Sequence, residues 1–235
     1  MILEVEKIHT FYGWSHILFD ISLGIEERET VAILGRNGAG KTTTFRSIMG
    51  LTPPKVGEVR YKGEIISGQR PYMIARKGIG YVPSGHKVFG DLTVVENLLV
   101  GTKKAFKSGL LPRTPEEIYN LFPILGQRRK QRAGTLSGGE RQMLTIARTL
   151  MGNPEVLILD EPSTGLSPLV INNLGEKIHQ LKGEGLSILL AEQNAKFGMA
   201  LCERCYIIDK GEIRYQGLTL ELQQNQELMQ MYLAV

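Results

Sequence analysis

One glycine-rich segment constrains this chain more than any other. Residues 35–42 read Gly-Arg-Asn-Gly-Ala-Gly-Lys-Thr and fit the pattern G-x-x-x-x-G-K-T of a phosphate-binding loop. The apolar residues 31–34 before it predict a buried strand, and residues 42–49 after it predict a helix that stops at Gly50. A phosphate loop requires strand, loop and helix in this order. A glycine-rich turn with a chance lysine is the alternative.

The residue types in this loop suit phosphate chemistry. Glycines let the backbone curl until successive N–H groups face a phosphate, and the helix N-terminus adds partial positive charge. Lys41 is expected to reach the β- and γ-phosphates, and the Thr42 hydroxyl to bind Mg²⁺. We therefore predict a nucleoside triphosphate site formed by Gly35, Arg36, Asn37, Gly38, Ala39, Gly40, Lys41, Thr42 and Thr43.

The composition is that of an ordinary globular protein. The 235 residues are 42% hydrophobic and 22% charged, which is enough to bury a sizeable core. No run approaches the roughly 18 apolar residues of a membrane span, and no signal peptide is recognisable, so we expect a cytosolic chain. The net charge of +4 is too small to indicate nucleic acid, and we expect no nucleic-acid partner. Cys202 and Cys205 lack the further ligands of a zinc site, so we interpret them as small buried residues.

The order of the expected elements predicts an α/β fold. Alternating or turn-rich patterns over residues 2–8, 17–25 and 57–66 favour antiparallel strands near the N-terminus. Residues 79–83 read as a strand that ends at a proline. From about residue 93 to 135 the apolar period is helical, with no convincing strand, which predicts a mostly helical lobe.

A second motif opens the helix that follows this lobe. It consists of Leu136, Ser137, Gly138, Gly139 and Glu140. A serine and two glycines at a helix N-terminus suit a second anion, because free N–H groups and the helix dipole point outward there. An ordinary N-cap is the alternative, and it accounts for the serine but not for the doubled glycine.

A third motif joins an apolar strand to two carboxylates. Residues 156–159 are Val-Leu-Ile-Leu, and Asp160 and Glu161 follow directly. We expect Asp160 to hold the Mg²⁺ shell and Glu161 to polarise an attacking water. A further strand over residues 187–191 ends at polar residues 192–194. Alternating strands and helices predict a parallel sheet with ligand groups at the carboxyl ends of its strands.

With these three motifs assembled, the chain resembles, nearly end to end, the ATP-binding subunit of ATP-binding cassette (ABC) transporters. Residues 35–42 match the Walker A motif, residues 136–140 the signature motif, and residues 156–161 Walker B with its catalytic glutamate. Tyr12 falls at the position of the adenine-stacking aromatic. The signature motif at this spacing is much more specific than a phosphate loop alone.

The resemblance implies a P-loop NTPase cassette with a mixed RecA-like sheet core, an N-terminal antiparallel β subdomain and a helical lobe. We expect residues 1–235 to form one ABC ATPase domain, with the core over about 1–90 and 136–235 and the lobe over about 91–135. It further implies ATP hydrolysis with Mg²⁺, coupled to transmembrane transport. In this family two cassettes pair head to tail, and ATP lies between one protomer's phosphate loop and the other's signature serine.

Further segments narrow the resemblance to the shorter ATPase of high-affinity branched-chain amino acid importers. These segments are residues 81–83, 88–89, 92–97, 131–140 and 192–194. Such a subunit lies peripherally on the cytoplasmic face of the inner membrane. The implied partners are a second ABC ATPase, two membrane permeases docked on the helical lobe and, indirectly, a periplasmic binding protein. A heterodimer is favoured over a homodimer. Import of urea or short amides, and lipopolysaccharide-type export, are the alternatives.

Three positions depart from the general family pattern. Ser84 replaces the Q-loop glutamine, Ser167 the D-loop aspartate, and Gln193 the switch histidine. We assign Gln193 to catalysis and Ser84 to the metal site by position. Glutamine can donate a hydrogen bond to a phosphate but cannot carry a positive charge, and serine is too short to replace glutamine. The site built on this chain's own phosphate loop is therefore expected to hydrolyse ATP slowly.

Overall fold

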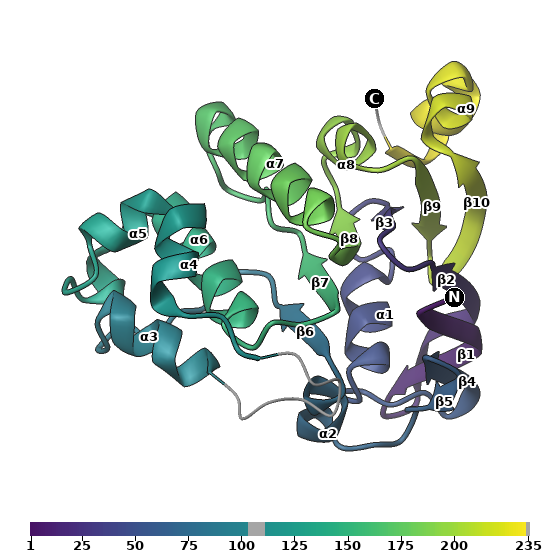
Figure 1. The fold of residues 1–235 in the computed structure, drawn as a ribbon. Helices are drawn as coiled ribbons and strands as arrows, with labels where there is room; N and C mark the ends of the chain where they lie inside the picture. The colour runs from purple at the N-terminus through teal and green to yellow at the C-terminus, as the bar shows by residue number, and fades with distance from the viewer. Residues whose placement is uncertain (103–110, 234–235) are drawn as a thin grey trace.

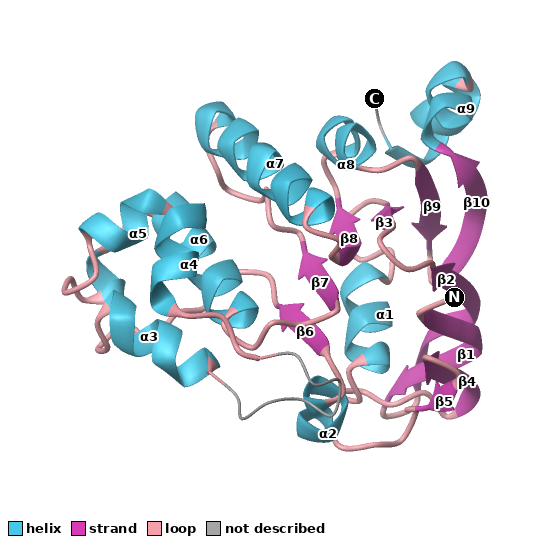
Figure 2. Cartoon of the chain, in the orientation of Figure 1, coloured by secondary structure: helices cyan, strands magenta, loops and turns pink. Residues whose placement is uncertain are grey.

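The computed structural model describes residues 1–102 and 111–233. Two sheets form its framework (Figures 1 and 2). The smaller sheet is antiparallel, in the order β2-β1-β4-β5. Its strands are β1 (Leu3–Tyr12), β2 (Ser15–Ile25), β4 (Val56–Tyr61) and β5 (Glu64–Ile65). The expected N-terminal antiparallel part is confirmed, although β1 extends through Tyr12, beyond the strand expected over residues 2–8.

The larger sheet has the order β10-β9-β3-β8-β7-β6, in which only β10 runs antiparallel to its neighbour. The strands are β3 (Thr30–Leu34), β6 (Ile79–Val82), β7 (Val156–Asp160), β8 (Ser187–Glu192), β9 (Arg204–Asp209) and β10 (Glu212–Leu218). Every residue of β3, β7 and β8 is buried, as expected of strands covered on both faces. The predicted parallel sheet is therefore confirmed.

The helices pack around the large sheet, and some of them gather at one side of it. They are α1 (Lys41–Ile48), α2 (Pro71–Arg76), α3 (Val94–Gly101), α4 (Pro115–Leu121), α5 (Pro123–Gln127), α6 (Gly138–Leu150), α7 (Pro168–Gly183), α8 (Ala195–Leu201), α9 (Thr219–Gln224) and α10 (Gln226–Leu228). A 3₁₀ turn spans Ala133–Thr135 and a π turn spans Met229–Leu233. Helix α1 contacts strands of both sheets, whereas α3, α4 and α5 lie with α6 away from the antiparallel sheet (Figure 1). No helix in residues 1–102 and 111–233 is long and apolar enough to cross a membrane.

Local sequence signals set several helix starts. Helices α3, α4 and α6 each begin with a capping box. In each one, the N-cap Thr or Ser side chain accepts a hydrogen bond from the N3 backbone N–H, and the N3 Glu side chain accepts one from the N-cap backbone N–H. Thr93 is the N-cap of α3, and helix α6 ends at Leu150, before Asn153 and Pro154. Cys202 and Cys205 are buried and unpaired, and burial raises the pKa of each thiol to about 12.

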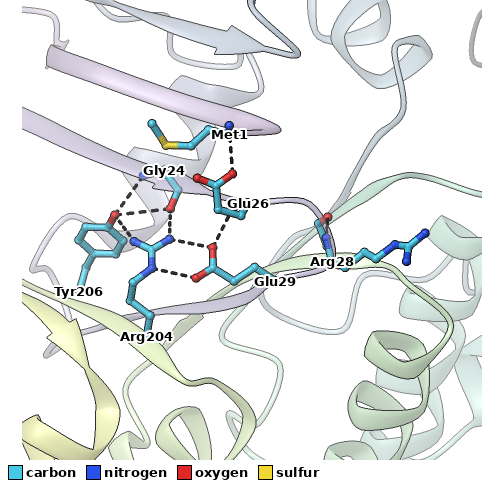
Figure 3. A network of polar contacts seen from close by, with 8 residues as sticks. Met1, Gly24, Glu26, Arg28, Glu29, Arg204 and Tyr206 are labelled. Carbon is cyan, nitrogen blue, oxygen red and sulfur yellow. Dashed lines mark hydrogen bonds and ion pairs between the residues drawn. The ribbon is translucent and has the colours of Figure 1, made fainter.

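A polar network ties the two sheets together (Figure 3). Arg204 of β9 donates two hydrogen bonds to the Glu29 carboxylate, both of 2.8 Å, and a third of 2.8 Å to the Gly24 carbonyl in β2. A fourth, of 2.6 Å, reaches the Tyr206 hydroxyl. Burial alone would raise the pKa of Glu29, but the hydrogen bonds from Arg204 and from the Glu26 N–H lower it below the usual glutamate value. The bidentate pairing fixes the guanidinium plane and so the angle between the sheets.

Glu29→Gln should therefore destabilise the fold at neutral pH by roughly 1–3 kcal/mol, because it replaces a charge-assisted bidentate contact with a neutral one. The folded-state pKa of Glu29 is lowered, so its contribution is present above the unfolded value of 4.5 and is lost as pH falls through the folded value. Denaturant unfolding of wild type and variant from pH 7 to pH 3 measures this. Glu6→Gln, at an exposed carboxylate, is the matched control. A difference that stays constant down to pH 3 would contradict the role of the charge.

Candidate functional site

The phosphate loop lies between the central strand β3 and helix α1. A side chain at Gly35 would collide with the Ile208 carbonyl, and Gly40 has φ +119° with Leu18 and Ile208 packed against it. The first helical hydrogen bond runs from the Thr44 N–H to the Gly40 carbonyl, at 2.9 Å. The N–H groups of residues 41–43 therefore point out of the helix N-terminus. This is the backbone cradle that a phosphate requires.

Lys41 is buried beneath this loop. Its side chain is 3% exposed, and its ammonium donates to the carbonyls of Gly35 (2.7 Å) and Arg36 (2.9 Å). It also forms an ion pair with Glu161 Oε1 at 3.0 Å. A charge this deeply buried must be paired, and these three oxygens meet that need. Lys41 and Glu161, which are 120 positions apart in sequence, thus lie in direct contact.

Asp160 closes the other side of the loop. Its Oδ1 accepts from the Thr42 hydroxyl at 3.0 Å, and its Oδ2 accepts from the Tyr81 hydroxyl at 3.1 Å. Burial is the largest influence on this carboxyl and raises its pKa, while the two hydrogen bonds act in the opposite direction. A carboxylate beside a threonine hydroxyl at the mouth of a phosphate loop is the hard-oxygen donor set that Mg²⁺ prefers. The residues present therefore fit Mg²⁺.

Glu161 has an unusual backbone conformation. Its φ is +49°, a region that L residues with a side chain rarely adopt, and its N–H donates to the Ala191 carbonyl at 2.9 Å. The side chain is 17% exposed. The carboxylate therefore emerges beside Lys41 with one edge open to solvent, where it could contact a water molecule.

Three predicted residues lie at the margins of this cluster. Tyr12 ends β1 and is 45% exposed, and Gln193 is exposed at the end of β8. Ser84 follows β6, but the residue of that strand that bonds Asp160 is Tyr81. The roles assigned to these three by position stay predictions.

The signature residues lie apart from the phosphate loop. Ser137 caps α6, and the Glu140 carboxylate returns the bond by accepting from the Ser137 N–H at 2.8 Å. Ser137, Gly139 and Glu140 border a groove of about 510 Å³ between α5, α6 and α7. Leu136 and Gly138 belong to the same turn, and no hydrogen bond or ion pair joins residues 136–140 to residues 35–43 in the described ranges.

Two contributors were missed by the sequence analysis. Tyr81 was read only as part of a strand, and Glu192 only as one of three polar residues at a sheet edge. Glu192 is fully buried, and its carboxylate accepts from the Ser163 N–H (2.9 Å), the Ser163 hydroxyl (2.8 Å) and the Asn194 N–H (3.3 Å). A carboxylate ending an otherwise apolar buried strand was the available signal.

A phosphate loop after the central parallel strand β3, with a carboxylate pair at the end of β7 on the far side of β8, defines a P-loop nucleotide hydrolase. Comparison with known proteins agrees. The family model described as ABC transporter matches residues 18–164. The chain is 40% identical to the high-affinity branched-chain amino acid transport ATP-binding protein BraG of Pseudomonas aeruginosa, covering 99% of both chains. It is 34% identical to the lipopolysaccharide export ATP-binding protein LptB of Haemophilus influenzae, over 99% of this chain and 97% of the relative.

The fold is also similar to solved structures of this family. A solved ATP-binding cassette of an ABC transporter, in its ADP conformation, superposes with a TM-score of 0.84 over 98% of this chain and 97% of that one, at 24% identity. The chain belongs to the ABC transporter family, and it is an ATP-hydrolysing enzyme. The resemblance stated from its motifs is confirmed.

Lys41→Ala should weaken ATP binding about ten- to a hundredfold, because one charge-assisted contact to phosphate is worth roughly 1.5–3 kcal/mol. Calorimetric titration of ATP with Mg²⁺ measures the change. Lys130→Ala removes an equal charge from an exposed position outside the site and serves as the control. Equal affinities in the two variants would show that Lys41 does not bind phosphate.

Proposed function

We propose that this chain energises the import of branched-chain amino acids as one ATPase subunit of an ABC transporter. The observation that carries the proposal is the 40% identity to BraG, which extends over 99% of both chains. The replacement of the switch histidine by Gln193, which we associate with this type of subunit, supports the same choice.

In the proposed site, Lys41 and the loop N–H groups bind the β- and γ-phosphates, and Tyr12 stacks on the adenine. Thr42 and Asp160 hold Mg²⁺, which neutralises phosphate charge when bound, and Ser84 is placed nearby by position. Glu161 accepts a hydrogen bond from the attacking water and aims it at phosphorus, while Gln193 donates to a γ-phosphate oxygen. Because Lys41 contacts Glu161, the phosphate bound by Lys41 and the water bound by Glu161 would lie next to each other at this ion pair.

The separation of the signature residues from the phosphate loop supports a head-to-tail dimer. The N-terminus of α6, with Ser137, would complete the site of a partner cassette. The lobe that carries this helix would be formed by about residues 91–135. We favour a second ABC ATPase as the partner over a second copy. Gln193 and Ser84 weaken this chain's own site but leave the signature helix intact, so the two sites of such a heterodimer would turn over unequally.

The helical side offers a surface for the membrane permeases. Phe89, Leu99 and Val100 are large apolar side chains that stay exposed there. The Asn97 side chain donates to the Phe89 carbonyl at 3.0 Å, which fixes the preceding loop against α3. We propose this rigid apolar patch as the docking site of the permeases at the cytoplasmic face of the membrane, with the periplasmic binding protein acting through them.

Lipopolysaccharide-type export is the second candidate, because LptB is 34% identical over nearly all of both chains. Reconstitution in proteoliposomes with the membrane proteins encoded beside the gene separates the two. Import predicts that a binding protein loaded with leucine or valine stimulates ATP hydrolysis and uptake, while the unloaded protein does not. Stimulation by lipopolysaccharide without any binding protein would favour export.

Glu161→Gln should lower ATP hydrolysis at least about a hundredfold while ATP still binds, because the amide keeps the side chain's size but loses the carboxylate that orients water. Phosphate release and ATP affinity are measured on the same preparation. Glu176→Gln, on the exposed side of α7, is the control. Normal turnover in Glu161→Gln would overturn the assignment.

The same substitution tests the unequal sites. In the reconstituted transporter, the equivalent change in the partner ATPase should reduce transport more than Glu161→Gln in this chain. Equal losses from the two changes would count against the asymmetry.

A further inference from the structure

We propose that Glu192 is a positioning residue that holds the turn after β7 so that Glu161 keeps its working orientation. This inference rests on the role proposed above for Glu161. It concerns a buried carboxylate on a different strand, to which the chemistry of hydrolysis assigns no part.

The contacts of Glu192 form a clamp on this turn. One carboxylate oxygen accepts from the Ser163 N–H at 2.9 Å, and the other accepts from the Ser163 hydroxyl at 2.8 Å. Ser163 is itself 5% exposed and lies two residues beyond Glu161. A single side chain therefore holds both the backbone and the side chain of Ser163, which leaves the turn little freedom to rotate.

A second contact from the same strand, β8, holds the other end of the turn. The Ala191 carbonyl accepts from the Glu161 N–H at 2.9 Å. Residues 191 and 192 of β8 thus bond residues 161 and 163 in parallel. With φ at +49°, Glu161 would relax to a more common backbone conformation if its surroundings allowed it. The two contacts from β8 oppose this relaxation.

The carboxylate also links this turn to the switch position. Its third donor is the Asn194 N–H, at 3.3 Å, directly after Gln193. Glu192 is 0% exposed, and no ion pair with a Lys, Arg or His neutralises it within residues 1–102 and 111–233. Burial raises the pKa of this carboxyl because it disfavours the charged form, while the hydrogen bonds from Ser163 and Asn194 act in the opposite direction. A carboxylate has enough lone pairs for all three donors, whereas a neutral amide oxygen with its NH₂ group has not.

The alternative is that Glu192 merely helps the sheet edge to fold. Both readings predict some loss of stability on substitution, so stability does not distinguish them. They differ in catalysis. A positioning residue acts on the chemical step through Glu161 and leaves ATP binding alone, because neither Lys41 nor the loop N–H groups hydrogen-bond to Ser163 within residues 1–102 and 111–233.

The test is Glu192→Gln in the reconstituted transporter, measured by ATP affinity and by single-turnover hydrolysis of radiolabelled ATP. The amide can still accept from the Ser163 N–H, but its NH₂ group opposes the Asn194 N–H donor. We expect the hydrolysis rate to fall about ten- to a hundredfold with ATP affinity unchanged within about twofold. Glu29→Gln, which weakens a carboxylate network far from the nucleotide site, is the matched control and should leave the hydrolysis rate unchanged.

A double-variant cycle shows whether the effect passes through Glu161. In a Glu161→Gln background, adding Glu192→Gln should cause little further loss. A full additional loss in that background, or an unchanged rate for Glu192→Gln alone, would overturn the positioning role while leaving the proposed function of Glu161 intact. Normal turnover of Glu161→Gln alone would instead overturn the proposed function of that residue, and the inference with it.

Ser163→Ala provides the same test if Glu192→Gln does not fold. It removes one of the two bonds to Ser163 and keeps the backbone bond, so we expect a smaller fall in hydrolysis rate, about three- to tenfold, again with ATP affinity unchanged. An unchanged rate in Ser163→Ala would contradict the proposal that Glu192 acts by holding Ser163.

Discussion

The parallel pairing of β3, β8 and β7 determines where every charged group of the nucleotide site lies. Leu34 pairs with Glu192, and Asp160 pairs with Ala191, so the three strands end at one level. The phosphate loop follows the first strand, the switch turn follows the second, and Glu161 follows the third. Because parallel strands place their carboxyl ends at the same edge, segments distant in sequence meet there without any further device. The helices need only cover the two faces.

This edge gathers three buried ionisable groups. Lys41 is 3% exposed, Asp160 1% and Glu192 0%, although burying an ionised group is costly unless it is paired or hydrogen-bonded. Each is satisfied differently: Lys41 by two carbonyls and Glu161, Asp160 by two hydroxyls, and Glu192 by donors on the adjacent turns. Such clusters are typical of functional sites, where stability is given up for fixed electrostatics.

The sequence predicted the residues whose chemistry is carried by a local motif. Lys41 belongs to a glycine-rich motif after an apolar strand, Asp160 and Glu161 follow another apolar strand directly, and the structure brings all three together. Tyr81 and Glu192 were not found, because their partners lie 79 and 29 positions away and depend on which strands are neighbours. A buried parallel strand is apolar on both faces, so periodicity gives no register and cannot show which side chain crosses to the next strand. The end of β1 was also missed, since a strand was expected over residues 2–8 and β1 extends through Tyr12.

In the proposed head-to-tail arrangement, a second chain supplies the remaining part of the site. Helix α6 presents its N-terminus, with the Ser137 cap and two glycines, on the helical side of the molecule, whereas the phosphate loop opens at the edge of the large sheet (Figure 1). Both are regions of partial positive charge, and bringing two such regions together is unfavourable until an anion lies between them. A polyphosphate held by one chain's loop would remove that repulsion and allow the signature helix of another chain to approach. The same anion would then be both the substrate and the bond between the two chains, so that its cleavage weakens the contact it had made. In this arrangement, Glu192 would couple the two proposed catalytic residues to loss of the phosphate, because its carboxylate accepts from Ser163, two residues after Glu161, and from Asn194, directly after Gln193.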